Sequence, residues 1–342
     1  MKTRRVVITG FGSPDVLALI EEEMPEPLVG QVRVKILAAG VAYADIGMRL
    51  GTYPSQRTGP PPFTPGYDIV GIVDKVGAGV TAVRPGDRVA ALTTVGGYAE
   101  YLCLPAAELV PVPEGVDAAE AVSLVLNYVT AYQMLHRVAE VKSGEAILVH
   151  GAAGGVGTAF LQLGKLAALK TIGTASAAKL PLVEQLGATA LDYRIGDWVG
   201  RVMALTASGV GSAYDPIGAE NFRRSFRALR PGGILVTYGN YVASQRGHAD
   251  AQAVVAAHAA REELKQQTGE GRRLANYFIG GMKEAHPDWF QSDLKTLLDL
   301  LAQKKISPVI AERLPLAKAR RAHALLDQAA VSGKIVLIPS PA

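Results

Sequence analysis

One short stretch near the N-terminus holds residues that could move a proton. Residues 40–54 read GVAYADIGMRLGTYP, with two tyrosines, Tyr43 and Tyr53, a single carboxylate, Asp45, and neither cysteine nor histidine. A tyrosine has an ordinary pKa of about 10, but it can protonate an oxygen or a carbon that has become basic. Tyr53 is therefore either an acid or an aromatic wall, since pocket aromatics often only shape a site. Asp45 either holds the loop or contacts a cofactor.

A glycine cluster in ILVHGAAGGVGTA, residues 147–159, lies between an apolar strand-like run and a helix-like one. Backbone N–H groups at such a helix start can receive a pyrophosphate, because the first turn has unpaired donors and the positive end of the helix dipole. The strict G-x-G-x-x-G spacing is not met, since Ala152 stands at its first glycine position. Glycines here can also be mere turns, but the βα units that follow favour a dinucleotide site. We expect contacts from Ala152, Gly154, Gly155, Val156 and Gly157.

The end of the following predicted strand favours NADPH. Folds that bind NAD place an acidic residue there, where it accepts a hydrogen bond from the ribose 2′-hydroxyl. This strand ends GTASAAK, without an acid, and offers the hydroxyl of Ser176 and the cation of Lys179. A hydroxyl and a cation suit a 2′-phosphate.

The elements that must position these residues fall into two patterns. The first third of the chain has short apolar or alternating runs split by Pro-Gly and Gly-Asp turns, which predicts a small barrel-like β domain. A helical pattern spans 119–139, and strands then alternate with helices, which predicts a parallel, doubly wound sheet. An exposed helix and loop are expected within 245–275. A final helix is expected at 292–305, before a closing strand at 333–339.

Composition narrows the function classes. Hydrophobic residues make up 49% and charged residues 19% of the 342 residues, as is usual for a globular enzyme. The net charge is +4, but basic residues mix with acids, so no nucleic-acid partner is expected. The single cysteine, Cys103, excludes an internal disulfide and a multi-cysteine zinc site, and we expect it in the core. With no membrane-spanning run and no signal peptide, the sequence predicts a cytoplasmic protein.

The motifs in their order resemble the medium-chain dehydrogenase/reductase superfamily, and within it the zinc-independent quinone oxidoreductase (zeta-crystallin-like) branch. The resemblance includes PGYDIVGIVDKVGAGVTAVRPGDRVAAL, ILVHGAAGGVG, LRPGGILVTYGN and the final GKIVLIP. It implies an α/β protein with a GroES-like β-barrel domain at 1–126 and 283–342 and a Rossmann NADPH-binding domain at 127–282. It also implies a homodimer, for which RRLANYFIG is the candidate pairing strand.

The same resemblance assigns cofactor contacts residue by residue. Thr130 in NYVTAY matches a position near the nicotinamide. Ser176, Lys179 and Tyr193 match the 2′-phosphate pocket of relatives that use NADPH. Further contacts are assigned to Gly239, Asn240 and Lys334.

Departures from the family pattern bear on the reaction. Relatives that depend on zinc carry a cysteine where this chain has Ala42, and a His-Glu pair where it has Tyr67 and Asp68. We therefore expect no metal. Many quinone reductases carry asparagine at the place of Ala42, so substrate preference does not transfer directly. Without a metal to polarise a simple ketone, the expected acceptors spread the developing charge themselves. These are quinones and α,β-unsaturated carbonyls.

Two reactions and one non-catalytic role follow from these observations. The leading hypothesis is NADPH:quinone reductase activity. The rival is an enoyl (alkene) reductase, in which Tyr53, in the GTYP motif, resembles the proton donor of enoyl-thioester reductases. Tyr43 and Tyr67 are further candidate pocket residues, with Ala42 and Asp45. A non-enzymatic cofactor-binding module is the least favoured reading.

Overall fold

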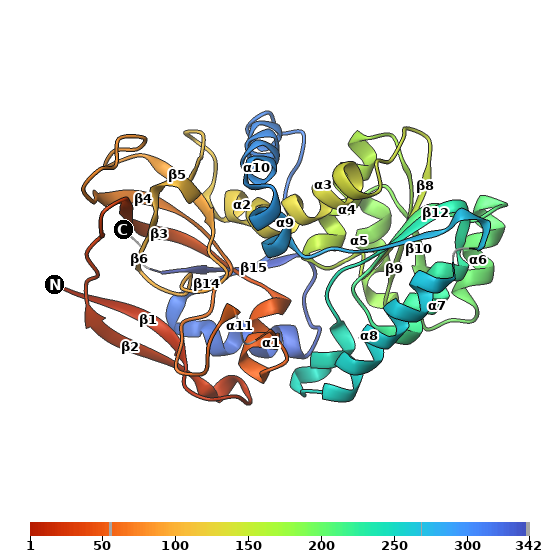
Figure 1. Cartoon of the computed structure of the whole chain (residues 1–342), viewed down its shortest axis with the longest axis horizontal. Helices are drawn as coiled ribbons and strands as arrows, with labels where there is room; N and C mark the ends of the chain where they lie inside the picture. Colours follow the sequence, from red (N-terminus) through yellow and green to blue (C-terminus); the bar gives the residue numbers. More distant parts are fainter. Residues whose placement is uncertain (55–56, 268, 340–342) are drawn as a thin grey trace. The chain divides into compact units, whose positions relative to one another are not determined.

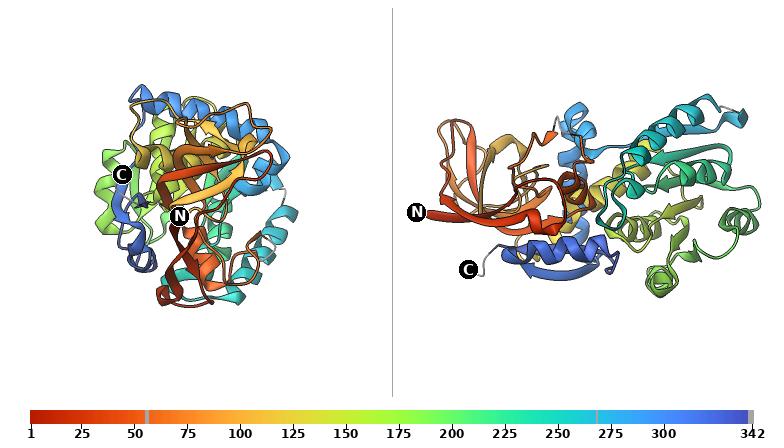
Figure 2. Two further views of the ribbon diagram at one scale, coloured as in Figure 1. Left: turned by 90° about the vertical axis from the view of Figure 1, so that its left-hand side faces the viewer. Right: turned by 90° about the horizontal axis from the view of Figure 1, so that it is seen from below.

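The computed structural model describes residues 1–54, 57–267 and 269–339, which form two compact units (Figures 1 and 2). The first unit comprises Met1–Val129, Arg246–Ala249 and Pro287–Ala342. The second comprises Thr130–Gln245 and Asp250–His286. Among the described residues, no helix is long and apolar enough to cross a membrane.

The first unit is built on β-strands. Their bounds are β1 Lys2–Ile8, β2 Leu17–Glu23, β3 Gln31–Val41, β4 Asp68–Val76, β5 Arg88–Leu92, β6 Tyr101–Pro105, β7 Val110–Pro111, β14 Ile310–Pro315 and β15 Lys334–Ile338. A seven-stranded sheet has the order β14-β15-β3-β4-β5-β7, with β6 paired to β3, and β1 and β2 form a separate hairpin. Strand β15 pairs antiparallel with β3, so residues near the C-terminus complete a sheet begun near the N-terminus.

Helices of the first unit are α1 Tyr43–Leu50, α2 Ala118–Ser123, the π-helical turn η4 Leu124–Tyr128, α10 Pro287–Ala302 and α11 Ala319–Asp327. The prediction that the helix at 292–305 is the last one was wrong, because α11 follows it. Helix α11 buries only Ala319, Ala322 and His323, so it lacks the stripe of large apolar residues that periodicity detects. Helix α10 also starts earlier than expected, at Pro287, whose fixed φ suits a first helical position.

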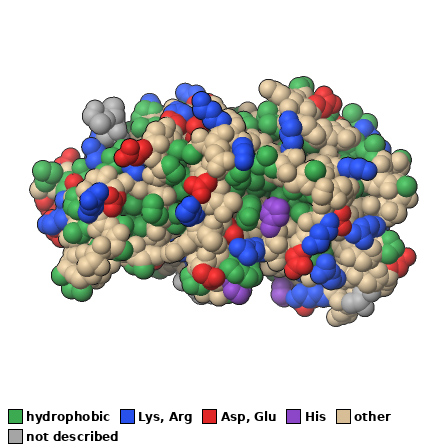
Figure 3. Space-filling model, turned by 90° about the horizontal axis from the view of Figure 1, so that it is seen from above, with side chains coloured by type: hydrophobic (Ala, Val, Ile, Leu, Met, Phe, Trp, Pro, Cys, Tyr) green, Lys and Arg blue, Asp and Glu red, His purple; other side chains and the backbone are tan. Residues whose placement is uncertain are grey.

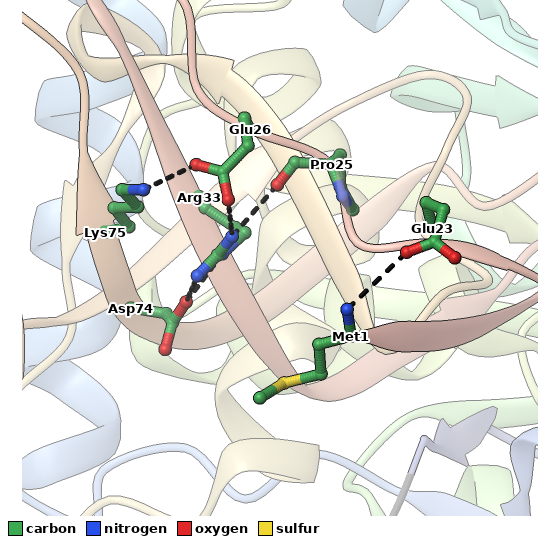
Figure 4. A network of polar contacts seen from close by, with 7 residues as sticks. All are labelled: Met1, Glu23, Pro25, Glu26, Arg33, Asp74 and Lys75. Atoms are coloured by element: carbon green, nitrogen blue, oxygen red, sulfur yellow. Dashed lines mark hydrogen bonds and ion pairs between the residues drawn. The ribbon is translucent and has the colours of Figure 1, made fainter.

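A charged network fixes β3 against β4 (Figure 4). The guanidinium of Arg33 donates to Asp74 at 2.6 Å and to Glu26 at 3.0 Å, and Lys75 donates to Glu26 at 2.6 Å. Cys103 lies opposite Arg33 on β6 and is only half-buried, so the expectation of a core cysteine was wrong. Among the described strands, β6 pairs with β3 alone and is mostly half-buried, so a residue on it has few neighbours to cover it.

The second unit contains a six-stranded parallel sheet. Its strands are β8 Ala146–His150, β9 Lys170–Ala175, β10 Thr189–Asp192, β11 Val210–Asp215, β12 Leu229–Thr237 and β13 Arg273–Asn276. The order is β10-β9-β8-β11-β12-β13, and every neighbouring pair is parallel. The predicted doubly wound sheet is confirmed. Strand order reverses between β8 and β11, which is where such sheets bind ligands, at the carboxyl ends of the strands.

Helices alternate with these strands. They are α3 Val129–Gln133, the π-helical turn η5 Met134–Val138, α4 Gly155–Leu166, α5 Leu180–Gln185, α6 Trp198–Thr206, α7 Ala219–Arg227, α8 Ala251–Gln266 and α9 Ile279–Ala285. The core of this unit packs Trp198, Phe222 and Phe226 against Leu148 of β8. Helix α8 is the exposed helix expected within 245–275. On the face drawn in Figure 3, lysines and arginines are interspersed with acids and form no single basic patch.

Candidate functional site

Asp45 is fully buried in the first unit, where its carboxylate accepts hydrogen bonds from two backbone N–H groups. Oδ2 accepts the N–H of Ala42 at 2.8 Å, and Oδ1 accepts the N–H of Gly66 at 3.2 Å. Ala42 precedes α1 and has no side chain that could cap the helix, so Asp45 supplies an acceptor there. Burial raises the pKa of Asp45 to about 7, and the charge of Asp68 adds to this, while the N–H donors oppose it. Asp45 thus joins the start of α1 to the residue before Tyr67.

The same carboxylate begins a buried chain of polar contacts. The hydroxyl of Tyr98 donates to Asp45 at 3.1 Å and lies 3.2 Å from Nε2 of His323. Nε of Arg49 donates to Nδ1 of His323 at 3.3 Å, and its Nη2 donates to both oxygens of Asp327, at 2.8 and 2.7 Å. Because Arg49 can only donate, Nδ1 of His323 accepts and Nε2 carries the proton. No sequence signal revealed this chain, since α1 and α11 are far apart in sequence.

His323 is held neutral in this chain, which has a consequence for stability. Burial and the neighbouring Arg49 lower the pKa of His323 to about 3. Between about pH 3 and 6.5, the imidazole of His323 therefore takes up no second proton in the native state, whereas it does so in the unfolded state. The corresponding stability is present above pH 6.5 and is lost as the pH falls, by at most about 1.4 kcal/mol per pH unit.

Replacing His323 by glutamine is therefore expected to flatten the pH dependence of unfolding. At pH 8 the variant should be less stable than the wild type by about 1–3 kcal/mol, because buried partners lose a hydrogen bond. At pH 5 this deficit should shrink by about 2 kcal/mol. Urea unfolding at the two pH values measures the change. A deficit that is equal at both would show that His323 is not held neutral.

Tyr53 and Tyr67, both predicted as site residues, come together in the first unit. Their hydroxyl oxygens lie 2.8 Å apart, and their rings meet edge to face at 6.3 Å between centroids. Tyr67 is 1% exposed, whereas Tyr53 is partly exposed. Burial raises the pKa of Tyr67 strongly, and the contact with Tyr53 adds to this. Tyr43 lies partly buried in the first turn of α1. The pair presents a phenol O–H beside a partly exposed aromatic ring.

Lys334 lies inside the first unit in an ion pair with Asp68. Its Nζ is 2.9 and 3.2 Å from the two carboxylate oxygens, and the two side chains are 3% and 0% exposed. A Cβ on Gly40 would lie 2.4 Å from both Cε of Lys334 and Oδ1 of Asp68, so only glycine fits beside the pair. Burial raises the pKa of Asp68, and Lys334 opposes this shift.

The donor set around Asp68 does not suit a zinc ion. Of the three positions that hold ligands in zinc-dependent relatives, Ala42 has no donor atom, and the hydroxyl of Tyr67 is already bonded to Tyr53. The remaining carboxylate is neutralised by Lys334. Within the described ranges, no group of three or more His, Cys, Asp or Glu side chains is placed to hold a metal ion. Zinc prefers three or four such ligands.

In the second unit, the glycine loop has the geometry of a phosphate cradle. Strand β8 ends at His150, and α4 begins after Gly154, which is extended (φ −79°, ψ 177°) and has no side-chain cap. A Cβ on Gly157 would meet the carbonyl oxygen of Gly151 at 2.2 Å, so the loop closes only around glycine. Ala152 is buried, while Gly154 is exposed and Gly155 and Val156 are partly exposed. The first turn of α4 therefore presents backbone to an anion, as a pyrophosphate requires.

Buried polar side chains near the carboxyl ends of β8, β9 and β11 form hydrogen bonds with one another. His150 lies 2.8 Å from the hydroxyl of Thr174 on β9 and 2.9 Å from that of Ser225 on α7. Ser225 donates to Asp215 at 2.6 Å, and Asp215 also accepts the N–H of Ile217 at 2.8 Å. Although a serine, a histidine and an aspartate meet here, the Ser225 proton is directed to Asp215, so the arrangement does not activate a nucleophile. Its role is to fix the ends of β8, β9 and β11.

The residues expected at a 2′-phosphate lie at the ends of β9 and β10. Ser176 follows β9 directly, and the short 3₁₀ turn Ala177–Lys179 carries Lys179. The N–H of Tyr193, just after β10, donates to the carbonyl of Ala175 at 3.3 Å, which brings the two strand ends together. Burial lowers the pKa of Lys179. Arg194, which the sequence did not single out, lies over the half-exposed ring of Tyr193 at 5.6 Å and adds a second cation.

Hydrogen bonds join helix α8 to the end of β12 and to the loop that follows it. Arg261 donates to the Thr237 hydroxyl at 3.0 Å and to the carbonyl of Gly239 at 3.1 Å. Nδ2 of Asn240 donates to the carbonyl of Ala253 at 3.1 Å, and its buried Oδ1 has no hydrogen-bond partner among the described residues. A buried acceptor of this kind favours a donor from a bound molecule. Thr130, expected near the nicotinamide, is buried in α3.

Comparison with known proteins places this geometry in context. Residues 29–114 match the alcohol dehydrogenase GroES-like domain, and residues 186–337 match a family described as zinc-binding dehydrogenase. The rat quinone oxidoreductase is 30% identical over 98% of this chain and 97% of its own. The rat synaptic vesicle membrane protein VAT-1 homolog is 33% identical over 99% of this chain and 84% of its own.

Solved structures agree with these matches. Escherichia coli quinone oxidoreductase, determined in complex with NADPH, is 28% identical, with a TM-score of 0.88 over 98% of this chain and 100% of its own. The CurK enoyl reductase, 23% identical with a TM-score of 0.85 over 98% of this chain and 99% of its own, shares the fold. The expected combination of a GroES-like domain with a Rossmann domain is confirmed.

Proposed function

Because the chain belongs to the medium-chain dehydrogenase/reductase superfamily, in its quinone oxidoreductase branch, we propose that it is an NADPH-dependent, zinc-independent reductase of quinones or related conjugated carbonyls. The observation that carries the proposal is the Lys334–Asp68 ion pair, which occupies the carboxylate that a metal would need. Without a Lewis acid, a simple ketone would gain a poorly stabilised oxyanion. A conjugated acceptor delocalises that charge.

The cofactor fits the second unit through backbone and side-chain groups. We assign the pyrophosphate to the backbone from Gly154 to Gly157, at the start of α4, and the 2′-phosphate to Ser176, Lys179 and Tyr193. We assign a hydrogen-bonding group of the cofactor to the buried Oδ1 of Asn240. When bound, NADPH supplies the hydride. For an acceptor that must be protonated on carbon, we assign the proton to the hydroxyl of Tyr53.

A panel of quinones and enones, assayed with NADPH and with NADH alongside metal analysis of the purified protein, tests the proposal. We expect turnover of at least one of the two acceptor classes, faster with NADPH, in protein without stoichiometric zinc. A preference for NADH of more than about tenfold, equivalent to about 1.4 kcal/mol, would contradict the assignment of the 2′-phosphate pocket. Stoichiometric zinc would contradict the metal-free assignment.

Replacing Lys179 by alanine is expected to raise KM for NADPH by about tenfold or more, because a charge-assisted hydrogen bond contributes about 1.5–3 kcal/mol. KM for NADH, which lacks the 2′-phosphate, should hardly change. The matched control is Lys165→Ala, at an exposed lysine on α4. Steady-state kinetics with both cofactors measure the effect, and an equal rise for the two would show that Lys179 does not read the phosphate.

A second candidate function is favoured by the contact between Tyr53 and Tyr67. An enoyl (alkene) reductase must protonate a carbon after hydride addition, and a positioned phenol can do this. A quinone needs no such acid, because its reduced anion takes a proton from water. The ratio of enone to quinone turnover therefore distinguishes the two functions.

We also propose a homodimer that pairs through β13, which with β10 is one of the two edge strands of the parallel sheet. An edge strand has unpaired backbone groups that a second copy can satisfy. Sedimentation equilibrium measures the state, and a monomer at micromolar concentration would exclude it. The cytoplasmic location expected from the sequence stays a prediction.

A further inference from the structure

The carboxylate of Asp215 lies at the end of β11, beside the point where the strand order reverses. It is 0% exposed, and donors meet both of its oxygens. Oδ1 accepts the N–H of Ile217 at 2.8 Å, while Oδ2 accepts Nδ2 of Asn221 at 2.7 Å and the hydroxyl of Ser225 at 2.6 Å. The bond to Ile217 closes a turn of the kind that aspartate favours. The side chain of Asp215 therefore sets the course of the backbone directly after β11.

The turn after β11 lies against two loops that we assign to the cofactor. A Cβ on Gly151, in the glycine loop, would lie 4.0 Å from Cγ of Pro216. A Cβ on Gly239, in the loop after β12, would lie 3.9 Å from Cβ of the same proline. The carbonyl of Pro216 also accepts the N–H of Tyr241 at 2.7 Å. Pro216 is therefore in contact range of both loops.

The turn also packs against Asn240. The carbonyl of Ile217 accepts the N–H of Val242 at 3.0 Å. A Cβ on Gly218, whose φ is +152°, would overlap with Cγ2 of Val242 and lie 3.1 Å from Oδ1 of Asn240. This Oδ1 is the buried acceptor that has no hydrogen-bond partner among the described residues. A displacement of the turn would therefore displace the group that we assign to the cofactor.

A chain of buried hydrogen bonds fixes the carboxylate of Asp215 on its other side. Because the hydroxyl of Ser225 donates to Asp215, it accepts the proton on Nε2 of His150, at 2.9 Å. Burial lowers the pKa of His150, so its ring carries one proton, and Nδ1 accepts the hydroxyl of Thr174 at 2.8 Å. The carbonyl of Thr174 in turn accepts the N–H of Ala152, in the glycine loop, at 3.0 Å. The donors and acceptors thus allow one orientation for each side chain.

We propose that Asp215 is a positioning residue for the cofactor, which fixes the turn after β11 and thereby places Asn240 relative to the glycine loop. This inference rests on the proposed function, in which these two segments hold NADPH. Asp215 needs no contact with the cofactor, because it acts through the backbone of Ile217. A loop that is ordered before binding loses less conformational freedom when the ligand binds, and the affinity is higher for that reason.

The full-length variant Asp215→Asn tests the inference, because it keeps the shape of the side chain. The carboxylate accepts three donors on its two oxygens, so the amide nitrogen of the variant faces at least one of them. We expect Kd for NADPH, measured by calorimetric titration, to rise by about tenfold or more, as for the loss of a hydrogen bond to a charged group.

Adenosine 2′-monophosphate separates positioning from a general effect on the fold. It carries the 2′-phosphate but neither the pyrophosphate nor the nicotinamide. The pocket that we assign to this phosphate lies at the ends of β9 and β10, which the pairing of those two strands holds together. Kd for this fragment should therefore stay within about twofold of the wild-type value in Asp215→Asn. A merely structural role would weaken the binding of both ligands.

Two further variants complete the test. Ser212→Ala is the matched control, because its buried hydroxyl lies on the same strand and donates to that of Tyr214 at 3.0 Å; it should change neither constant. Asn221→Ala decides the question if Asp215→Asn does not fold. It removes one donor to Asp215 from the first turn of α7, where alanine favours the helix. It should raise Kd for NADPH by about threefold and leave that of the fragment unchanged.

The outcomes are distinct. An unchanged Kd for NADPH in every folded variant of Asp215 and Asn221 overturns the inference, although the proposed function then stands. An equal rise of Kd for NADPH and for the fragment assigns Asp215 to the fold and overturns the inference as well. A wild-type protein that reduces neither enone nor quinone contradicts the proposed function itself.

Discussion

Replacement of Tyr53 by phenylalanine is expected to lower enone turnover by about 10²–10⁴-fold, the range that a positioned general acid contributes. Phenylalanine keeps the ring and removes only the hydroxyl that lies 2.8 Å from Tyr67. An aromatic wall would therefore survive the change, and an acid would not. Turnover of a quinone should fall much less, because a hydroquinone anion is protonated by water. Steady-state kinetics with both acceptors measure the difference.

Cofactor binding provides the control for this variant. Tyr53 lies in the first unit, whereas the groups assigned to the cofactor phosphates lie in the second. The dissociation constant for NADPH, measured by fluorescence titration, should stay within about twofold of the wild-type value, a difference of about 0.4 kcal/mol. Unchanged enone turnover would assign Tyr53 to the wall of the pocket. Weaker NADPH binding together with slower turnover would mean that the substitution disturbed more than the proton.

The parts of the site that the sequence predicted are local in the chain. The glycine loop could be predicted because one strand, one turn and one helix start lie within 147–159. The atoms that would overlap with a Cβ at Gly157 belong to the same segment. Ser176 and Lys179 follow from a single strand end in the same way. The alternation of strands and helices predicted a parallel sheet for the same reason, since each strand–helix–strand unit is short in sequence.

The parts that the sequence missed join distant segments. Arg49 and His323 lie on α1 and α11 and meet inside the first unit. Thr94 has a left-handed backbone, and its N–H donates to the carbonyl of Tyr67; neither feature can be read from residue types. A cofactor contact was expected for Lys334. Its ion pair with Asp68 could not be predicted, because Asp68 lies on another strand that is distant in sequence.

Replacement of Lys334 by methionine is expected to destabilise the first unit by about 3–5 kcal/mol, because it leaves the carboxylate of Asp68 buried without its partner. Asp68 is 0% exposed, and its oxygens lie close to the backbone at Gly40. The variant carboxylate can relieve this cost by taking up a proton. Its stability should therefore improve as the pH falls, in the direction expected for a buried acid with a raised pKa.

The double variant Lys334→Met/Asp68→Leu separates the cost of an unpaired charge from the loss of packing. Replacing both members of a buried pair by apolar residues of similar size is often nearly neutral, so most of the stability should return. Urea unfolding of the two variants at pH 8 and pH 5 measures both effects. If the single variant is as stable as the wild type at pH 8, the ion pair contributes nothing to the stability of the fold.

Metal analysis of Lys334→Met gives a second expected result. Because Ala42 and Tyr67 still offer no strong ligand, removing the lysine partner of Asp68 should not create a zinc site.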